Sequence, residues 1–283
     1  MLHVVGRLNN GYHHLQTLMT FVDYCDVLEL TTGYQKDTLT ITGIFANALK
    51  NPSINSVLQA KQWFYHYFDL PVLFFQIKLE KNLPVAAGIG GGTSDAAAMI
   101  AALIDIHQLE LSLAQKQQLV IASGILGADV PVCLAFQLGL GHYFWLDGSG
   151  TKELPQTFKF EEPLDIVLIN PGIAVNTGTV FQSLNQSFSM AIPMPVITST
   201  SQMLTFVSHT QNDLQQPARQ AYPGIPNISS IVKGLVDTLS IVRQTGSGST
   251  YFVLAPNAKT TCILAKHLQQ NYPNWWIKTG KTL

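Results

Sequence analysis

At 283 residues, the chain is long enough to bury one large core or two modest ones, and we expect two lobes with a site between them. Charged residues make up only 12% of the chain and the formal net charge is −1, which argues against a nucleic-acid partner. The sequence has no apolar run of about 18 residues and no secretory leader pattern, so we expect a cytoplasmic protein without a membrane partner. The three cysteines stand far apart, which predicts neither a disulfide framework nor a metal site.

In chain order, the first half reads as short strands and amphipathic helices. Apolar residues alternate with Thr or Glu over 27–31 and 38–42, which is the period of half-buried strands. Over 55–68 the apolar residues recur at helical spacing instead. The strands expected in this half span 2–5, 27–31, 38–42, 71–79 and 134–144. One helix is expected over 55–68, a second from the end of a glycine-rich loop to about 107, and a third over 113–123, with a glycine cap at Gly124.

The second half alternates strands with helices, which indicates a split βαβ layer. We expect a turn at 147–150, close to a lobe boundary, and a mobile surface loop at 187–201. The expected strands span 164–170, 240–243, 251–254 and 275–278, and the expected helices open at 175–181, follow 211–214, and span 225–239 and 258–270. The expected boundary gives an N-terminal lobe over 1–150 and a C-terminal lobe over 151–283.

The most informative stretch is 79–103, where a glycine-rich loop leads into an alanine-rich helix. Small residues leave the loop backbone almost free of Cβ atoms, so its N–H groups can approach a ligand closely. Thr93, Ser94 and Asp95 follow as good N-cap or first-turn residues of the helix. Open N–H donors at the positive end of a helix dipole suit a polyphosphate. The alternative is a plain turn, but a turn rarely needs four glycines in five positions, so we favour a phosphate loop.

Two common phosphate-binding motifs do not fit this loop. A Walker loop ends in Gly-Lys-Ser or Gly-Lys-Thr, and no lysine follows these glycines. A dinucleotide fingerprint needs a third glycine at the position where Thr93 stands. The loop therefore belongs to another type of phosphate site.

Two further features carry chemistry, and the residues alone leave both interpretations open. Asp129 presents one carboxylate among apolar neighbours in a small-residue turn, where it fits a helix cap and a desolvated proton acceptor equally well. Tyr12, His13 and His14 follow a turn, where they fit either the binding of a base or sugar or ordinary packing.

Three segments together resemble the GHMP kinase family. LPVAAGIGGGTSDAA at 83–97 is similar to the phosphate loop of that family, and RQTGSGSTYFVL at 243–254 is similar to its C-terminal glycine-rich loop. LGADVPV at 126–132 resembles the turn that carries the catalytic base. The resemblance covers essentially the whole chain. It implies a two-lobed α+β fold with a ribosomal-protein-S5-like N-terminal lobe and a ferredoxin-like C-terminal lobe.

Within this family, the chain is most similar to the branch that phosphorylates a cytidine diphosphate sugar alcohol on the methylerythritol phosphate route to isoprenoids. GRLNNGYHHLQTL at 6–18 and QNDLQQPA at 211–218 carry this likeness. The resemblance implies a kinase that uses ATP as phosphoryl donor, with Mg²⁺ carried by the ATP. It also implies ATP binding and catalysis in the N-terminal lobe, substrate binding in the C-terminal lobe, and a monomer or homodimer.

The same resemblance assigns roles to individual residues. Asp129 would be the base that accepts the proton of the attacking 2-hydroxyl group. Tyr12 and Phe181 would sandwich the cytosine. His13 would hydrogen-bond the edge of the base, and Thr177 would lie near the sugar and base. The implied ATP site comprises Asn55 and Lys81 beside the adenosine, and Pro84, Gly88, Gly90, Gly91, Gly92, Thr93 and Ser94 around the phosphates. Gly246, Ser247 and Gly248 form the C-terminal glycine loop of the family.

The chain departs from the family pattern before its first residue. Family members carry a Pro-Ala-Lys strand whose lysine bridges the base and the transferred phosphate, and Met1 falls a few positions after that lysine. We expect either a sequence that starts late or a protein without this cation, whose loss would slow phosphoryl transfer. Two alternatives therefore stay open: a family kinase for homoserine or a mevalonate-type alcohol, and a nucleotide-binding protein without useful catalysis.

Overall fold

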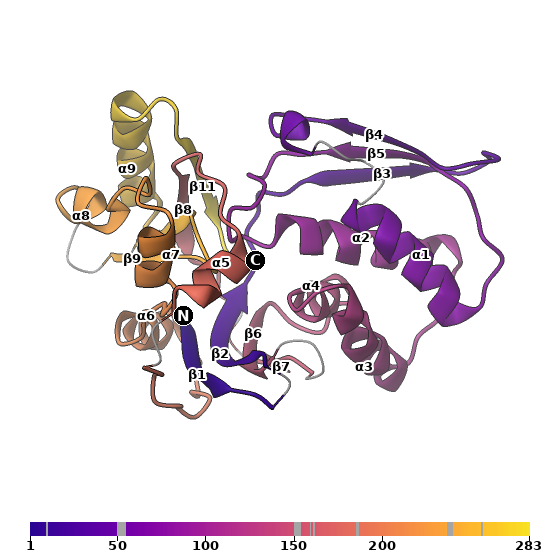
Figure 1. Ribbon diagram of the computed structural model, residues 1–283, viewed down its shortest axis with the longest axis horizontal. Coiled ribbons are helices and arrows are strands. Elements are labelled where there is room, and N and C mark those ends of the chain that lie inside the picture. Colours follow the sequence, from indigo (N-terminus) through magenta and orange to yellow (C-terminus); the bar gives the residue numbers. More distant parts are fainter. Residues whose placement is uncertain are drawn as a thin grey trace.

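The computed structural model describes residues 1–9, 11–49, 55–149, 154–158, 160, 162–184, 187–236, 240–255 and 257–283. These residues form an α+β molecule with three β-sheets covered by helices. The described residues of 27–137 gather on one side of Figure 1, in purple to magenta, and segments late in the chain gather on the other, in orange and yellow, while the indigo N-terminal segment lies beside the late segments. The α+β class expected from the sequence is confirmed.

The outer N-terminal sheet covers a layer of helices (Figure 1). Its strands are β3 (Val27–Thr31), β5 (Gln76–Glu80) and β4 (Thr38–Thr42) in that order, with β3 antiparallel and β4 parallel to β5. Its helices are α1 (Ser56–Phe68), α2 (Gly91–Ile106), α3 (Leu113–Ala122) and α4 (Val130–Gln137). Alternation along β5 points Ile77 and Leu79 into a core with Phe64 of α1 and Met99 of α2. This core holds the end of β5 next to the beginning of α2.

A central antiparallel sheet joins the two sides of the molecule. Its strands are β1 (Leu2–Arg7), β2 (His13–Thr20), β6 (Tyr143–Gly148) and β7 (Gln156–Thr157), in that order. Successive residues of β6 point to opposite faces, so Phe144 and Leu146 enter the N-terminal core. Tyr143 and Trp145 enter a second core that also contains Ile166 from the C-terminal sheet. One strand therefore ties both cores together.

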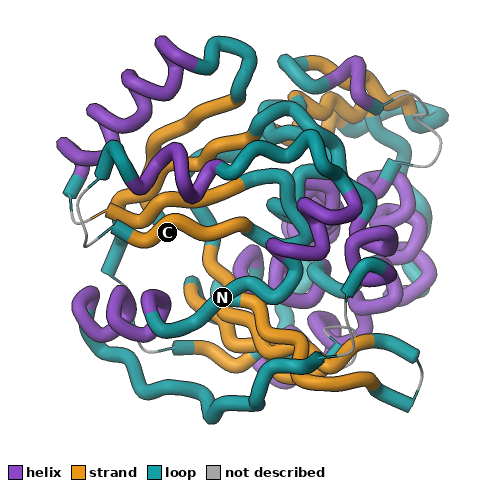
Figure 2. The backbone as a smooth tube through the Cα atoms, turned by 60° about the vertical axis from the view of Figure 1, so that its left-hand side comes forward, coloured by secondary structure: helices purple, strands orange, loops and turns teal. Residues whose placement is uncertain are grey.

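The C-terminal sheet is also antiparallel, with the order β11 (Trp276–Lys281), β8 (Asp165–Asn170), β10 (Tyr251–Ala255) and β9 (Ile241–Gln244). Figure 2 shows strands lying side by side with helices against them. The helices of this half are α5 (Thr177–Gln182), α6 (Thr200–Ser208), α7 (Gln215–Ala221), α8 (Ile228–Lys233) and α9 (Ala258–Asn271). We keep the lobe boundary near residue 150 as a proposal, because β6 ends before it and β8 opens the C-terminal sheet after it.

Helix α4 corrects the strand predicted over 134–144. Residues 130–137 are helical, and β6 begins only at Tyr143. Pro131 lies in the first turn of α4, a position that proline favours. A continuous apolar run does not distinguish a buried helix from a buried strand, which explains the error.

Several predicted boundaries were also wrong. Helix α3 ends at Ala122 and continues as a 3-10 turn (Ser123–Leu126), so Gly124 does not form a left-handed cap; the glycine with positive φ is Gly127. Asp147 does not lie in a turn but in β6, where it pairs with Gln16. Gly150 of that predicted turn lies outside the described residues.

Three further elements are shorter or end sooner than the pattern suggested. The strand predicted over 71–79 begins at Gln76. The helix predicted over 225–239 spans only Ile228–Lys233, and 237–239 lie outside the described residues. The loop predicted over 187–201 ends where α6 begins at Thr200, and its mobility stays a prediction.

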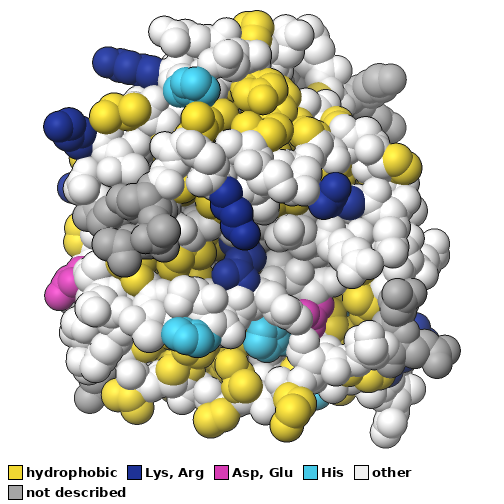
Figure 3. Space-filling view, turned by 90° about the vertical axis from the view of Figure 1, so that its left-hand side faces the viewer, with side chains coloured by type: hydrophobic (Ala, Val, Ile, Leu, Met, Phe, Trp, Pro, Cys, Tyr) yellow, Lys and Arg dark blue, Asp and Glu magenta, His cyan; other side chains and the backbone are white. Residues whose placement is uncertain are grey.

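The surface agrees with the low charge content of the sequence. Figure 3 shows a face that is mostly uncharged, with a small number of Lys and Arg side chains. Within the part of the chain that the structure describes, every helix is too short or too polar to cross a membrane.

Candidate active site

The predicted phosphate loop, residues 84–90, leads into α2 with its backbone exposed to a ligand. Gly88 and Gly90 have φ of 71° and 69°, a left-handed conformation that glycine adopts without strain. Gly90 is the N-cap of α2, and because it has no side chain, it leaves the first N–H groups of the helix without a side-chain cap. Thr93 and Ser94 lie in the first turn of the helix. Thr93 Oγ1 donates back to Gly90 O at 2.7 Å. The helix N-terminus therefore presents N–H groups and a positive dipole end, which favour an anion.

The C-terminal glycine loop, residues 245–250, packs directly against the phosphate loop. Thr245 Oγ1 donates to Gly88 O at 2.8 Å, across 157 residues of sequence. A Cβ atom on Gly88 would lie 2.6 Å from the amide nitrogen of Gly248. A Cβ atom on Gly246 would lie 2.6 Å from Gly88 O. Both loops therefore need glycine because their backbones touch.

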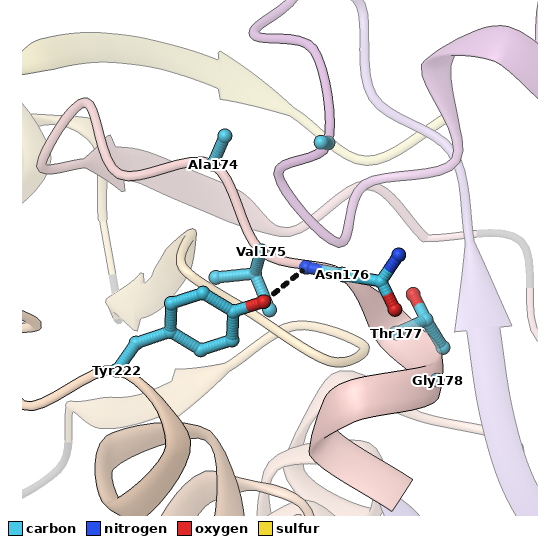
Figure 4. Close-up of a pocket in the computed structure, with 7 residues that line it drawn as sticks. Ala174, Val175, Asn176, Thr177, Gly178 and Tyr222 are labelled. Carbon is cyan, nitrogen blue, oxygen red and sulfur yellow. Dashed lines mark hydrogen bonds between the residues drawn. The ribbon is translucent and has the colours of Figure 1, made fainter.

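From the C-terminal glycine loop, contacts lead to α5. The hydroxyl groups of Ser247 and Thr177 are 2.9 Å apart, and Thr177 is the first residue of α5. Beside it lies a cavity of about 560 Å³, a size typical of small-molecule sites. In Figure 4 the Tyr222 side chain reaches across this region, and its hydroxyl accepts from Asn176 N at 2.9 Å. The lining residues are Ala86, Ala174, Val175, Asn176, Thr177, Gly178 and Tyr222.

Asp129 lies next to the first turn of α2. It precedes α4 directly, yet its side chain makes no capping hydrogen bond, so the carboxylate is not used by the helix. The preceding Gly127 brings this turn to Thr93, since a Cβ atom on Gly127 would lie 3.5 Å from Thr93 Cγ2. The Asp129 residue is exposed at the surface, but protein atoms surround its carboxyl group at longer range. The resulting desolvation raises the pKa of this carboxyl.

A buried thiol lies in the same turn. Cys133 Sγ lies 3.9 Å from Thr93 Oγ1. Burial, together with the negative charges of Asp129 and Asp95, raises the pKa of this thiol to about 12. Cys133 is therefore a neutral packing residue between α4 and the first turn of α2, as free buried cysteines usually are.

Two of the residues expected around the cytosine, His13 and Phe181, form a small aromatic cluster. The rings of His13 and Phe181 stack with centroids 4.8 Å apart and planes 19° from parallel. His13 Nε2 is buried and has no hydrogen-bond partner among the described residues. Burial, and then the charge of Arg7, lower the pKa of His13, which keeps its imidazole neutral. Tyr12 directly precedes His13 in the sequence, and it is 59% exposed.

The two residues expected beside the adenosine lie at helix and strand ends close to α2. Asn55 is buried and caps α1, where its side chain accepts from Val57 N at 2.9 Å. Gly92 lies near this cap, since a Cβ atom on it would lie 3.7 Å from Ser56 Oγ. Lys81 is also buried, and its ammonium group already binds two carboxylates. Contact of either side chain with adenosine stays a prediction.

Sequence reasoning missed three polar residues that support this site. Thr245 holds the two glycine loops together, and Asp26 binds Lys81. Asn212 Nδ2 donates to Gln244 O and Gly246 O, both at 2.8 Å, and so fixes the C-terminal glycine loop. The segment 211–218 had been noted only for its family likeness, and Asp26 carries no motif. A buried polar residue is recognisable only once its partners are known.

The chain matches the GHMP kinases N terminal domain over residues 55–136, a segment that contains α1, the phosphate loop, α2 and Asp129. The 4-diphosphocytidyl-2-C-methyl-D-erythritol kinase of Rhizobium meliloti (strain 1021) is 32% identical over 294 residues, which cover 99% of this chain and 91% of that protein. The kinase of the same name from Chelativorans sp. (strain BNC1) is 34% identical over 288 residues, with 99% and 92% covered.

Solved structures give the same grouping. A crystal structure of 4-(cytidine 5'-diphospho)-2C-methyl-D-erythritol kinase superposes with a TM-score of 0.73 and 25% identity, covering 99% of this chain and 94% of that chain. A homoserine kinase from Cytophaga hutchinsonii superposes with a TM-score of 0.66 at 15% identity, covering 94% and 88%, and so shares the fold. The chain therefore belongs to the GHMP kinase family, in the group of the 4-diphosphocytidyl-2-C-methyl-D-erythritol kinases.

Proposed function

We propose that this chain transfers the γ-phosphoryl group of ATP to the 2-hydroxyl of 4-diphosphocytidyl-2-C-methyl-D-erythritol. The observation that carries the proposal is the contact between two glycine loops. The first loop leads into the turn of α2 that meets the Asp129 turn at Thr93, and the second contacts α5, the helix that carries the stacked Phe181. One side of this arrangement suits a polyphosphate, the other suits a flat base, and Asp129 supplies a proton acceptor. The related kinases bear the name of the same substrate.

The phosphate loop would bind the triphosphate through its backbone. The open N–H groups at the beginning of α2 point toward the anion, and the loop geometry is fixed by the contact between Gly88 and Thr245. Mg²⁺ would arrive with ATP, bridging phosphate oxygens and neutralising their charge.

Asp129 would remove the proton from the attacking hydroxyl. Desolvation raises the pKa of its carboxyl, so the ionised group is a stronger base than an ordinary aspartate. As the hydroxyl oxygen bonds to the γ-phosphorus, the bond from that phosphorus to the β,γ-bridging oxygen breaks and ADP leaves. Asp129 takes the hydroxyl proton, and the products are ADP and a phosphate monoester.

The aromatic cluster would recognise the cytosine. Neutral His13 has both a donor and an acceptor nitrogen, and the unpartnered Nε2 can bond the base edge, which carries an amino donor and acceptor atoms. The base would enter between Tyr12 and Phe181, and the His13 ring must then leave its stack on Phe181. Thr177 lies where the ribose or diphosphate would pass toward the phosphate loop. We further propose that the protein is cytoplasmic, because the reaction consumes ATP. A monomer or homodimer stays the prediction for its oligomeric state.

The test is to identify the phosphorylated product. The chain is incubated with ATP, Mg²⁺ and one acceptor at a time: the cytidine compound, homoserine or mevalonate. We expect ADP release only with the cytidine compound, and a product whose ³¹P spectrum shows a new monoester on C2 beside the diphosphate. ADP release with homoserine or mevalonate instead would contradict the substrate, and ATP binding without transfer to any acceptor would contradict the kinase assignment.

A further inference from the structure

Three buried charged side chains, Asp26, Lys81 and Asp95, meet at the base of the phosphate loop. Lys81 directly follows β5 and Asp95 lies near the beginning of α2, so these two residues flank the loop. Lys81 Nζ donates to Asp95 Oδ2 at 2.6 Å and also to Asp26 Oδ2. The ammonium group therefore ties together two points 14 residues apart, across the neck of the loop.

Asp26 anchors the same neck through its other oxygen. Its Oδ1 accepts from Asn82 N at 2.6 Å and from Leu83 N at 2.9 Å, the two residues that lead into the loop. Asp26 also abuts the first residue of α2, because a Cβ atom on Gly91 would lie 3.5 Å from Asp26 Oδ2. One carboxylate thus fixes the backbone that enters the loop and touches the helix that leaves it.

Stability alone does not account for this cluster. The side chains of Lys81 and Asp26 are each 3% exposed and that of Asp95 is 7% exposed, so three charges are taken out of water. Apolar side chains of similar volume often stabilise a fold as well as a buried ion pair does. Two carboxylates also share a single ammonium group, which leaves one negative charge in excess.

The excess negative charge affects the protonation of Asp95. Burial, and then the repulsion from Asp26, outweigh the attraction of Lys81 and raise the pKa of Asp95 to about 6. A carboxyl whose pKa is higher in the folded than in the unfolded chain favours the fold most when protonated. The folded state therefore loses stability as the pH rises from 3.8 to about 6. Near neutral pH, an ionised Asp95 weakens the fold.

We propose that Asp26, Lys81 and Asp95 form a clasp that positions the phosphate loop and the N-terminus of α2 for ATP. This inference rests on the proposed function and adds positioning residues to it. The clasp closes the neck of the loop from one side, while Thr245 holds Gly88 at its tip from the other. Without the clasp, the N–H groups that bind phosphate lose their fixed geometry.

The chain contains a matched control for this arrangement. Asp37 Oδ2 accepts from Lys61 Nζ at 2.8 Å, and Asp37 Oδ1 accepts from Phe75 N at 2.9 Å. Asp37 thus binds a buried lysine and a backbone N–H, as Asp26 does. Phe75 precedes β5, at the end of the strand away from the phosphate loop. A change at Asp37 therefore removes the same kind of interaction without touching the loop.

The experiment compares Asp95→Ala, Asp95→Asn and Asp37→Ala in the full chain. The KM for ATP, the KM for the cytidine compound and the melting temperature are measured for each variant, and calorimetry gives the ATP affinity without acceptor. We expect Asp95→Ala to raise the KM for ATP about tenfold to a hundredfold, because misplaced binding groups lose that much. The KM for the cytidine compound should change less than about twofold. Asp95→Asn keeps an oxygen acceptor for Lys81, and it should recover most of the ATP affinity.

The outcomes separate the clasp from a general structural role. Asp37→Ala should lower the melting temperature and leave the KM for ATP unchanged. Equal effects of Asp95→Ala and Asp37→Ala on that KM, or equal rises in both KM values for Asp95→Ala, would overturn the clasp. If Asp95→Ala does not fold, Asp95→Ser takes its place, because the shorter hydroxyl side chain also withdraws the acceptor from Lys81 Nζ, and the same rise in the KM for ATP alone is expected. Failure of the unaltered chain to bind ATP would overturn the proposed function as well.

Discussion

The phosphate side and the cytosine side of the proposed site are built in different ways. On the phosphate side, the proposed binding groups are backbone N–H groups. The backbones of Gly88 and Gly246 touch, and the side chains of Thr245 and the clasp hold the phosphate loop. On the cytosine side, the groups are side chains: Tyr12 is 59% exposed, and the ring of His13 rests on Phe181.

This difference follows from what each ligand part requires. A phosphate is bound by several N–H groups at once, and their geometry has to be correct before the ligand arrives. A flat base needs two ring faces at stacking distance, and side chains reach that arrangement by rotation. Contacts between residues far apart in the sequence therefore hold the glycine loops in place, whereas the rings on the cytosine side can rearrange.

The largest effect should come from the group proposed to accept the proton. Asp129→Asn removes the proton acceptor, and kcat should fall about a thousandfold while the ATP affinity measured by calorimetry stays the same. Asp105→Asn, an exposed aspartate on α2, serves as the control and should leave kcat unchanged. Retained turnover in Asp129→Asn would mean that another group accepts the proton.

The next effect tests whether the phosphate side is held by its backbone contacts. Gly88→Ala forces a Cβ atom to within 2.6 Å of Gly248 N, whereas Gly172→Ala places one in open space at a similar positive φ of 79°. Both variants carry the left-handed strain of a Cβ atom, so the melting temperature should fall in both. Only Gly88→Ala should weaken ATP binding, by about a hundredfold. Similar ATP affinity in both variants would contradict the loop contact.

A smaller effect tests the cytosine side. Phe181→Ala removes one face of the expected sandwich and should raise the KM for the cytidine compound roughly tenfold to a hundredfold, since stacking on a base contributes about 1–3 kcal/mol. The KM for ATP should not change. Tyr272→Ala breaks another stacked pair, with Trp275 at 4.1 Å, and controls for the loss of ring packing alone. A rise of both KM values in Phe181→Ala would show that the two sides are not independent.

The smallest effect is a shift in the pH dependence. Asp129 must be ionised to accept a proton, and desolvation raises the pKa of its carboxyl above the ordinary value of 3.8. The rate should therefore fall as the pH decreases through this raised pKa, at a higher pH than for an exposed aspartate. The acid limb of kcat against pH measures it, and the residual activity of Asp129→Asn should lack that limb.

The sequence was most informative where the residue type itself reports a steric requirement or a burial pattern. Four glycines in five positions predicted a tight loop leading into a helix, and the structure confirms it, because only glycine allows the backbone to approach another backbone so closely. That this loop binds phosphate stays a prediction. The strands over 27–31 and 38–42 matched the structure residue for residue, since alternation reports a half-buried strand directly.

The sequence was least informative where a residue acts through a distant partner. Nothing local to Thr245 indicates that it bonds Gly88, and nothing local to Asp26 indicates that it binds Lys81. The stack of His13 on Phe181 likewise depends on where β2 and α5 meet. The roles of Asp129, Tyr12, His13, Thr177 and Phe181 came from family likeness and stay predictions until they are measured.

A crystal structure with the cytidine compound and a non-hydrolysable ATP analogue tests the contrast between the two sides most directly. We predict that the glycine loops do not move, with Thr245 Oγ1 still about 2.8 Å from Gly88 O, and that the triphosphate lies on the N–H groups of α2. We predict that the His13 ring has left Phe181 and that the cytosine has taken its place. A bound substrate with the His13 stack intact, or phosphates bound away from the glycine loops, would contradict the account.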